Sequence, residues 1–396
     1  MGAQQDSVVI VGAGPVGFLT ALGLARQGIA VTVIDAEPAI VRSPRAAVYF
    51  HTTLAILEKL GLLEEAEAIG YRNSHFSMRW PATGEVVRTD MRDNPDPGQT
   101  ITHNLHFGQH LLAELVMSHL LRFPHAHVLW SHRLTGLAQA DDGVRLTVET
   151  PDGETELRAG WVVGSDGARS SVRRLLGLEF EGHTWPERFV ATNIEYDFSP
   201  HGFADANMVI DPVDWAVIAK LGRDNLWRVT YGEDATLDEA AILERLPEHF
   251  ARILPAGASY RIDNFSPYRV HERCATSFRV GRVLLAGDAA HACNPCGGLG
   301  LTTGVIDADA LITALGAVIL GRAGEDVLDF YARERRRVFL EVTSPLASNF
   351  KRLLSERDPA RAAADKARIF GTAQSRQDIS DAPALSVMIL GQPMPV

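Results

Sequence analysis

The sequence predicts a two-domain α/β fold in which a parallel-sheet domain opens and closes the chain and a mostly antiparallel β domain is inserted into it. Residues 7–34 contain strand, glycine-rich turn, helix and strand in turn, which is one βαβ unit. Residues 177–273 are mainly strand-like and gather tryptophans and tyrosines. Residues 282–286 return to a buried-type strand, and two helices follow within 299–354. The length of 396 residues supports two domains, because one hydrophobic core usually stops growing at ~250–300 residues.

The first turn carries three glycines at the spacing of a dinucleotide-binding motif. Gly12, Gly14 and Gly17 follow a strand and open a helix. In that context the first glycine makes the tight turn, the second lets a pyrophosphate approach the backbone, and the third lets helix and strand pack closely. Asp35, at the end of the second strand, is placed to accept hydrogen bonds from a ribose hydroxyl. The pattern predicts a Rossmann-type site but does not separate FAD from NAD.

The middle of the chain supplies elements that flank the inserted domain. We expect a helix at 52–60, short strands within 75–89, a helix at 109–121 and a β-meander at 126–163. Residues 358–396 have no clear period, which predicts a loosely packed tail. The predicted division is residues 1–74, 100–177 and 274–357 for the first, discontinuous domain, 75–99 and 178–273 for the inserted domain, and 358–396 for the C-terminal tail.

Two further glycine-containing strings follow predicted strands. Residues 164–170 include Asp166, and alone they would suit a turn with a serine cap equally well. Residues 287–291 include Asp288, and the glycine-rich run 295–304 comes soon after. A carboxylate at a strand end suits polyol hydroxyls, and a glycine-rich helix start offers N–H groups and a positive dipole to a planar, partly anionic group. A ribityl chain and a flavin ring fit that description.

The three motifs, in this order and spacing, resemble those of the class A flavoprotein monooxygenases of the para-hydroxybenzoate hydroxylase type. The resemblance covers about residues 7–345, and residues 294–304 are most similar to the phenol and hydroxyphenylpropionate hydroxylase branch. It implies that the first domain is a glutathione-reductase-like FAD-binding domain and that the inserted domain binds the substrate. It also implies noncovalently bound FAD, with NADPH or NADH as co-substrate.

The resemblance also carries FAD contacts over to this chain. Asp288 would bind the ribityl chain, the backbone of residues 298–301 would contact the isoalloxazine ring, and Arg45 would reach the phosphates. The alternatives are a surface arginine for Arg45, a helix cap for Gln109 and a plain strand residue for Leu134. The predicted cofactor-binding residues are Gly12, Gly14, Gly17, Asp35, Arg45, Gln109, Leu134, Asp166, Asp288, Gly298, Leu299, Gly300 and Leu301.

The chemistry of that family defines the predicted activity. NAD(P)H reduces FAD, O₂ adds to the flavin C4a, and an electron-rich ring attacks the hydroperoxide, so the protein has only to bind, orient and exclude water. We therefore predict a monooxygenase that hydroxylates a phenolic or hydroxylated (hetero)aromatic substrate, with that small molecule and O₂ as its partners. The alternative is a flavin oxidoreductase that does not hydroxylate, such as a dehydrogenase, an oxidase or a halogenase. A plain NAD-dependent dehydrogenase and a non-catalytic flavin sensor are further alternatives.

The substrate cavity is expected between the inserted sheet and the flavin edge. The period of two in the strands between residues 215 and 231 predicts apolar faces carrying Trp215 and Tyr231, with Lys220 and Arg228 pointing away. If those faces are wrong, Arg228 points inward and anchors a substrate carboxylate. The alternative for the aromatic residues is a plain core position. The predicted pocket residues are His51, Trp215, Tyr231 and Pro295, and no catalytic residue is assigned.

Charge and hydropathy argue against several other classes of protein. The net charge of −11 is spread along the chain, which argues against nucleic acid as a partner. The longest apolar stretch, about residues 308–320, is too short to span a bilayer, and the first residues lack the basic segment of a signal peptide. We therefore expect a cytoplasmic protein without a membrane partner, and a homodimer is left open.

Cysteine usage fits a reducing compartment. Cys274, Cys293 and Cys296 are too few for a disulfide framework. Cys293 and Cys296 have the spacing of a redox pair or of half a metal site, but no second Cys/His cluster accompanies them. The favoured interpretation is two small apolar residues in a loop, and no metal site is predicted.

Overall fold

The computed structural model describes residues 6–42, 44, 46–93, 100–254, 257–374 and 385–396, and its centre is a six-stranded sheet. Every neighbouring pair of strands in this sheet is parallel except the pair at one edge. The strand order is β18 (Arg279–Val280), β19 (Val283–Leu285), β12 (Trp161–Gly164), β1 (Val8–Val11), β2 (Val31–Ile34) and β8 (Ala126–Leu129). Every residue of β1 and β12 is buried, as expected for inner strands that are covered on both faces.

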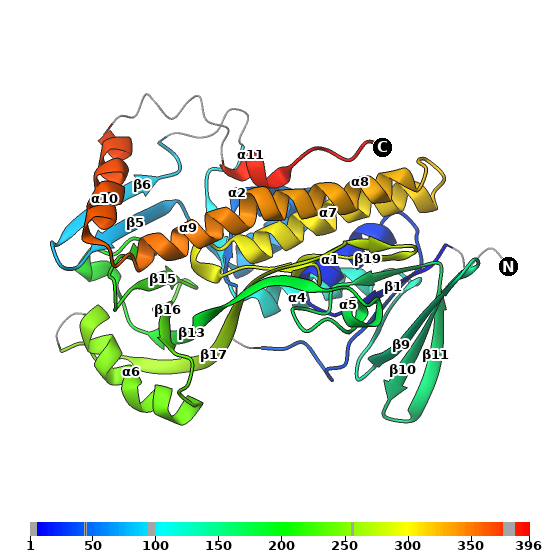
Figure 1. Cartoon of the computed structure of the whole chain (residues 1–396), viewed down its shortest axis with the longest axis horizontal. Helices are drawn as coiled ribbons and strands as arrows, with labels where there is room; N and C mark the ends of the chain where they lie inside the picture. The colour runs from blue at the N-terminus through cyan, green and yellow to red at the C-terminus, as the bar shows by residue number, and fades with distance from the viewer. Residues whose placement is uncertain (1–5, 43, 45, 94–99, 255–256, 375–384) are drawn as a thin grey trace.

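Helices pack on this central sheet and on one another (Figure 1). α1 (Pro15–Ala25) packs against α4 (Gln109–Leu120) and α7 (Leu299–Ile319), and α7 lies alongside α8 (Asp326–Val338). Of the described helices, α7 is long and apolar enough to cross a membrane by length and composition, and 72% of its most apolar stretch is buried inside the protein. That burial is typical of a core helix in an α/β domain.

Two small antiparallel sheets and three short helices complete this half of the molecule. The meander is formed by β9 (Arg133–Ala140), β10 (Gly143–Thr150) and β11 (Gly153–Ala159). The second small sheet is formed by β3 (Val48–Tyr49), β7 (Asn104–His106) and β4 (Tyr71–Asn73). The short helices are α2 (His51–Lys59), α3 (Leu63–Ile69) and α5 (Ser171–Leu175).

The remaining strands form one eight-stranded sheet, called here the large sheet. Its order is β20 (His291–Ala292), β17 (Arg261–Ala275), β13 (Phe180–Glu195), β16 (Leu226–Asp234), β15 (Ala216–Lys220), β14 (Ala206–Val209), β5 (His75–Trp80) and β6 (Glu85–Asp90). Its neighbouring pairs are antiparallel except β14 with β5. β20 follows β19 in the chain, so the large sheet is connected directly to the half of the molecule that contains the three glycine motifs. The sheet therefore couples the two halves of the molecule.

The two faces of the large sheet have different neighbours, and the register corrects one prediction. Tyr231 pairs with Ala216 across β16 and β15, and it packs in a core with residues of α6 (Glu239–Ile253), stacked on His249 at a ring distance of 4.0 Å. Trp215 lies in the core on the opposite face. The expectation that Trp215 and Tyr231 face one pocket is therefore wrong, because α6 covers the face that carries Tyr231.

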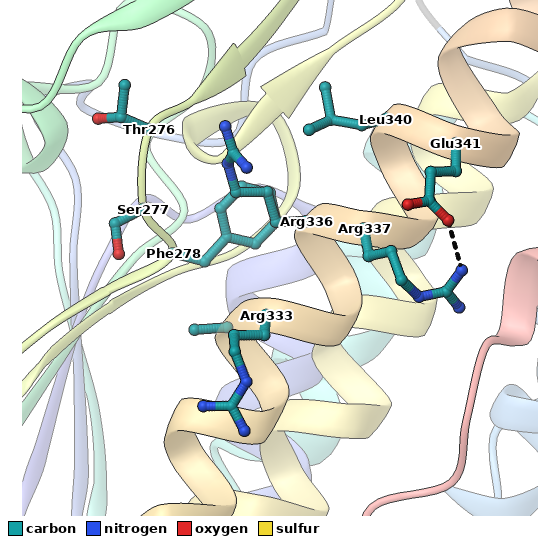
Figure 2. A pocket seen from close by; sticks show the side chains of 9 residues that line it. Thr276, Ser277, Phe278, Arg333, Arg336, Arg337, Leu340 and Glu341 are labelled. Carbon is teal, nitrogen blue, oxygen red and sulfur yellow. Dashed lines mark hydrogen bonds and ion pairs between the residues drawn. The ribbon is translucent and has the colours of Figure 1, made fainter.

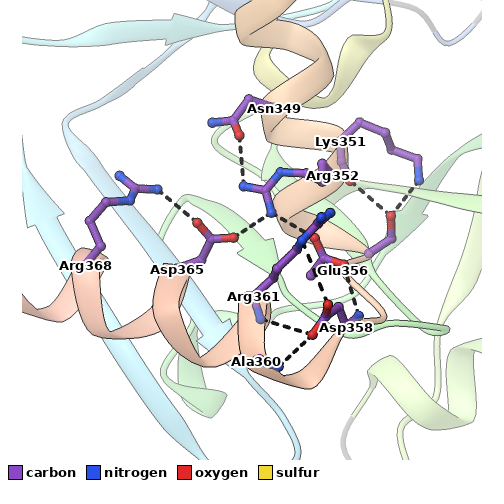
Figure 3. A network of polar contacts seen from close by, with 10 residues as sticks. Asn349, Lys351, Arg352, Glu356, Asp358, Ala360, Arg361, Asp365 and Arg368 are labelled. Atoms are coloured by element: carbon purple, nitrogen blue, oxygen red, sulfur yellow. Dashed lines mark hydrogen bonds and ion pairs between the residues drawn. The ribbon is translucent and has the colours of Figure 1, made fainter.

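The described parts of the C-terminal segment, residues 358–374 and 385–396, make specific polar contacts, whereas a loosely packed tail was expected. α9 (Ser344–Leu354) is joined to α10 (Pro359–Gln374) by Arg352, whose guanidinium lies 2.6 Å from Asp365 and 2.9 Å from Glu356 (Figure 3). α11 (Leu385–Leu390) is held by Arg335 of α8, which donates to two of its carbonyl oxygens. These partners come from distant parts of the sequence, so the local pattern alone does not reveal them.

Candidate FAD and substrate site

The three glycine motifs meet in the structure although they lie far apart in the chain. A Cβ on Gly12 would lie 2.4 Å from the carbonyl oxygen of Ser165, so the first motif touches the second. A Cβ on Gly287 or on Gly304 would lie 3.0 or 2.9 Å from the side chain of Val16, so the first motif also touches the third. The glycines of all three motifs thus permit close backbone approach around the start of α1.

The three glycines of the first turn are required for different reasons. Gly12 has φ +110°, and a Cβ on Gly17 would lie 2.0 Å from the carbonyl oxygen of Gly12, so both are required by the protein itself. A Cβ on Gly14 would meet no atom within 4 Å. Gly14 stands at the N-cap of α1, where helical N–H groups face outward. Protein packing does not explain this glycine, whereas a pyrophosphate approaching the helix start does.

Asp35 fixes the shape of the first turn. Its Oδ2 accepts from the backbone N–H of Ala13 at 2.7 Å, and its Oδ1 accepts from that of Glu37 at 2.9 Å. The carboxylate therefore ties the end of β2 to the glycine turn. Each oxygen keeps a further lone pair, so the predicted ribose contact is compatible with this geometry and stays a prediction.

Asp166 caps a helix with one oxygen only. Its Oδ2 accepts from the backbone N–H groups of Ser171 and Val172 at 2.6 and 3.3 Å, at the start of α5. Its Oδ1 is buried and has no hydrogen-bond partner among the described residues. Burial raises the pKa of Asp166, although hydrogen bonds from Ser170, Ser171 and Val172 oppose that rise. A buried acceptor without a partner is what a ligand hydroxyl would satisfy.

Asp288 is exposed at the end of β19, in the short 3₁₀ turn η3 (Gly287–Ala289), and a buried carboxylate holds that turn. Asp307 of α7 accepts from Gly287 N–H at 3.0 Å and from Arg335 Nε at 2.7 Å, and it lies 2.6 Å from His291 Nε2. Burial opposes ionisation of Asp307, but His291 and Arg335 outweigh it and lower its pKa to about 2. The Asp288 side chain is thereby presented to solvent by a fixed backbone.

The segment after Asp288 forms the start of α7. Asn294 caps the 3₁₀ turn η4 (Pro295–Gly297) by accepting from Cys296 N–H at 3.2 Å. Gly298 follows with φ +67° and N-caps α7, so residues 299–301 are its first turn. The hydroxyl of Thr302 donates to the carbonyl of Gly298 at 3.0 Å. The predicted flavin contacts Gly298, Leu299, Gly300 and Leu301 therefore offer helix N-terminal backbone rather than side chains.

Three further predicted FAD contacts lie on different elements of the fold. Gln109 begins α4, and its backbone N–H donates to Ala46 at 3.2 Å. Leu134 is buried in β9, where it pairs with Val148. Arg45 lies outside the described residues. The FAD contacts of all three stay predictions.

Arg228 points inward, which corrects the expectation that it faces away from the site. It is 8% exposed, lies on the face of β16 opposite Tyr231, and donates from Nε to Asn193 Oδ1 at 3.0 Å. Burial lowers the pKa of Arg228 to about 10, although Tyr268 and Tyr49 favour its charged form. The guanidinium therefore stays positively charged at neutral pH.

Tyr49 is a candidate site residue that the sequence prediction did not include. It is fully buried, stacked on Phe107 at 4.4 Å, and its hydroxyl has no hydrogen-bond partner within the part of the chain that the structure describes. Burial raises the pKa of Tyr49, and the charge of Arg228 opposes that rise. The next residue, Phe50, lies against Gly298: a Cβ there would be 3.1 Å from its ring. Residues 49–50 thus connect the Arg228 region with the start of α7.

The other predicted pocket residues occupy two places in the fold. Pro295 begins η4 and His51 begins α2, directly after Phe50. Trp215 packs on Phe189 at 5.0 Å and lies 4.8 Å from Lys351 of α9. The structure therefore brings His51 and Pro295 next to the Phe50–Gly298 contact. Trp215 lies in a core between the large sheet and α9, and this core also contains Cys296, the residue after Pro295. No amphipathic pattern distinguishes Tyr49, so only its orphaned hydroxyl identifies it.

One pocket lies between α8 and the turn after β17, with a volume of about 340 Å³ (Figure 2). Thr276, Ser277 and Phe278 line one side of it. On the helical side, Arg337 is paired with Glu341 at 2.8 Å. None of the predicted FAD or substrate residues lines this pocket. Within the described ranges, no group of three or more His, Cys, Asp or Glu side chains is arranged to hold a metal ion.

The fold and these groups define a flavin-binding protein of the glutathione-reductase-like α/β class. Comparison with known proteins agrees: a family described as "FAD binding domain" matches residues 5–344. Para-nitrophenol 4-monooxygenase of Pseudomonas sp. (strain WBC-3) is 47% identical over 365 residues, which cover 91% of this chain and 90% of the relative. 6-Hydroxy-3-succinoylpyridine 3-monooxygenase of Pseudomonas putida (strain DSM 28022 / S16) is 40% identical over 358 residues, 90% of this chain and 91% of the relative.

A solved structure of such a monooxygenase is also similar to this chain. The crystal structure of p-nitrophenol 4-monooxygenase from Pseudomonas putida DLL-E4 has a TM-score of 0.90 and 43% identity, covering 98% of both chains. The chain belongs to this FAD-binding family and is a class A FAD-dependent aromatic monooxygenase that uses O₂ and NAD(P)H. The predictions of family, fold class, activity and cofactor are confirmed. Hydroxyphenylpropionate hydroxylases are also among its relatives, as the similarity of residues 294–304 indicated.

The two cysteines near the flavin segment are expected to be dispensable for redox chemistry. Burial raises the pKa of both Cys293 and Cys296, so both thiols stay protonated and unreactive. We expect the Cys293→Ser, Cys296→Ser double variant to keep substrate-dependent NAD(P)H oxidation, with a stability loss of roughly 1–3 kcal/mol from the buried hydroxyls. NAD(P)H oxidation with and without an aromatic substrate measures this. A variant that binds FAD normally but has lost all substrate-dependent oxidation would restore the redox interpretation.

Proposed function

We propose that this monooxygenase oxygenates a phenol or hydroxypyridine at the ring carbon para to the hydroxyl, and that this carbon bears a substituent which the reaction displaces. The observation that carries the proposal is shared by the two relatives above. In para-nitrophenol 4-monooxygenase, the oxygenated position 4 bears the nitro group and is para to the hydroxyl. In 6-hydroxy-3-succinoylpyridine 3-monooxygenase, position 3 bears the succinoyl group and is para to the hydroxyl at position 6.

The chemistry favours an ionised substrate. FAD, when bound and reduced, supplies the chemistry that activates O₂. Loss of the hydroxyl proton raises the electron density at the para carbon, which is the position that must react with an electrophilic oxygen. Arg228 supplies a buried positive charge that stabilises such an oxyanion, and the Tyr49 hydroxyl supplies a donor beside it. The proposed role of Arg228 is to bind the substrate as its phenolate.

The proposed placement follows from the contacts of residues 49–50. The ring would lie between Arg228 on the large sheet and the start of α7, with Phe50 and Pro295 beside it. FAD would be held by the residues predicted above, with Gly14 at its pyrophosphate and Asp288 at its ribityl chain. In this arrangement residues 1–74, 100–177 and 274–357 bind FAD, and residues 75–99 and 178–273 bind the substrate. A cytoplasmic location and a homodimer also stay predictions from the sequence.

The test compares two isomers that differ only in the position of the displaced group. With para-nitrophenol, one oxygen atom of O₂ joins the ring carbon, and the other becomes water with two electrons from NAD(P)H. The carbon–nitrogen bond breaks, nitrite leaves with the bonding pair, and the ring is left as the quinone. We expect one nitrite for each NAD(P)H oxidised with the para isomer and none with meta-nitrophenol. Products that keep the nitro group, or equal turnover of the meta isomer, would contradict the proposal.

A further inference from the structure

We propose that Glu272 is a positioning residue through which the large sheet fixes the flavin-facing segment 294–298, and that its carboxylate lowers the reduction potential of the bound flavin. This rests on the proposed placement of the flavin ring at the start of α7. Glu272 lies near the end of β17 and is 6% exposed. No sequence motif includes it, and its role emerges only from what its two oxygens contact.

One oxygen of Glu272 gathers three donors. Its Oε2 accepts from the side-chain amide of Asn294 at 3.0 Å, from the backbone N–H of Asn294 at 3.3 Å and from Trp185 Nε1 at 3.4 Å. Trp185 belongs to β13, so two adjacent strands of the large sheet converge on this carboxylate. Three N–H donors on one oxygen hold Asn294 and Trp185 to this single carboxylate.

Those bonds continue to the start of α7. Asn294 is completely buried, and its Oδ1 accepts from Cys296 N–H at 3.2 Å, which shapes the turn η4. η4 ends at Gly298, the left-handed residue that N-caps α7. A side chain of the large sheet therefore fixes the backbone only four residues before the helix start that would receive the flavin ring. A shift of Glu272 would be transmitted along this short segment through the bonds of Asn294, Cys296 and Gly298.

The second oxygen of Glu272 is buried and makes no ion pair within 4 Å among the described residues. Its Oε1 is buried without a hydrogen-bond partner among the described residues, and no described Lys, Arg or His nitrogen lies within 4 Å of the carboxylate. Both Glu272 and Asp288 raise the pKa of Cys293, after burial, so the thiol senses both carboxylates. Cys293 itself lies against the helix start, 3.7 Å from where a Cβ on Gly300 would be. The field of Glu272 thus reaches the proposed flavin position.

The sign of the electrostatic effect follows directly. Reduction adds negative charge to the flavin, and a buried carboxylate nearby disfavours that charge. Glu272 should therefore hold the flavin potential below the value set by the α7 N-terminus alone. The two effects of Glu272 can be measured separately. Its hydrogen bonds should affect the affinity for FAD, and its charge should affect the reduction potential of the bound flavin.

The test is Glu272→Gln in the FAD-loaded enzyme. We expect the midpoint potential of the flavin to rise, and the dissociation constant for FAD to increase on the order of tenfold, because hydrogen bonds to a charged group become bonds to a neutral one. Asn294→Ala removes the link but keeps the charge. It should weaken FAD binding while shifting the potential less than Glu272→Gln does, so a folded Asn294→Ala still tests the proposal if Glu272→Gln does not fold.

The matched control is Glu233→Gln on the same sheet. Glu233 is 7% exposed in β16 and lies 3.2 Å from Arg245 of α6, on the side away from α7. It should leave both flavin quantities unchanged. Wild-type potential and FAD affinity in Glu272→Gln, or an equal shift in Glu233→Gln, would overturn the proposal. Neither quantity requires an aromatic substrate, so failure here and failure of the para-oxygenation proposal are distinguishable.

Discussion

Replacing Gly14 by valine is expected to abolish FAD binding, with at least ~100-fold weaker affinity, while leaving a folded protein. Gly14 has φ −82° and ψ 176°, an extended conformation that valine adopts readily. A Cβ at this position meets no atom within 4 Å, so the protein itself tolerates the side chain. The two γ-methyl groups would instead occupy the space through which a pyrophosphate reaches the first N–H groups of α1. The change should therefore affect the ligand far more than the fold.

Two measurements separate ligand exclusion from unfolding. Flavin fluorescence titration reports the FAD dissociation constant. The free energy of unfolding of the FAD-free protein, measured with urea, should fall by only about 1 kcal/mol, because valine is a poorer N-cap residue than glycine. Gly17→Ala is the contrasting variant, because its Cβ would lie 2.0 Å from the carbonyl of Gly12 and must disturb the protein with or without FAD. If Gly14→Val binds FAD with normal affinity, the pyrophosphate does not lie at this turn.

Much of the FAD-binding half could be predicted from sequence because its constraints are local. Gly12, Gly17 and Gly287 occur where the backbone comes too close to other atoms for a Cβ, or where φ is positive, and only glycine meets both demands. Such positions therefore appear in the sequence as glycines at a fixed spacing. The strands beside them, β1 and β12, are buried on both faces and therefore appear as unbroken apolar runs.

The inserted domain was less predictable, because the alternation of apolar and polar residues along a strand does not show which face of the strand points inward. The alternation in β16 correctly separates Arg228 from Tyr231, but the assignment of faces depends on α6, which packs over Tyr231. α6 was not expected within the inserted domain. Burying an arginine is unusual, so the apolar face was the natural choice for the inside. In the structure Arg228 is instead buried on the face opposite Tyr231, where its charge acts on Tyr49.

The C-terminal helices were also hard to predict from the sequence, because contacts with distant residues hold them in place. α10 is fixed by ion pairs from Asp365 to Arg352 and from Lys366 to Glu85 of β6. α11 depends on the buried Arg335 of α8. Such helices carry a weak sequence signal, because tertiary contacts rather than propensity determine whether they form.

Replacing Arg228 by methionine is expected to reduce kcat/KM for an acidic phenol such as para-nitrophenol by roughly 10²–10³-fold, because a buried charge partner contributes about 3–4 kcal/mol to binding an oxyanion. Methionine keeps much of the volume without adding a new buried polar group. Arg228→Lys should recover part of the loss, since it keeps the charge but loses the planar fork that holds Asn193. Arg245→Met, an exposed arginine of α6 on the other side of the sheet, is the control and should leave kcat/KM within about twofold.

The decisive comparison uses phenols of different acidity. If Arg228 binds the phenolate, Arg228→Met should weaken the binding of para-nitrophenol far more than that of para-cresol, which stays neutral near pH 7. It should also move the pH at which kcat rises upward, because the site no longer lowers the pKa of the bound phenol, and kcat reports ionisations in the enzyme–substrate complex. FAD content and thermal stability measured on the same samples separate this effect from loss of cofactor or fold. An equal loss for both phenols, with FAD fully bound, would mean that Arg228 orders the large sheet and that the substrate oxyanion is bound elsewhere.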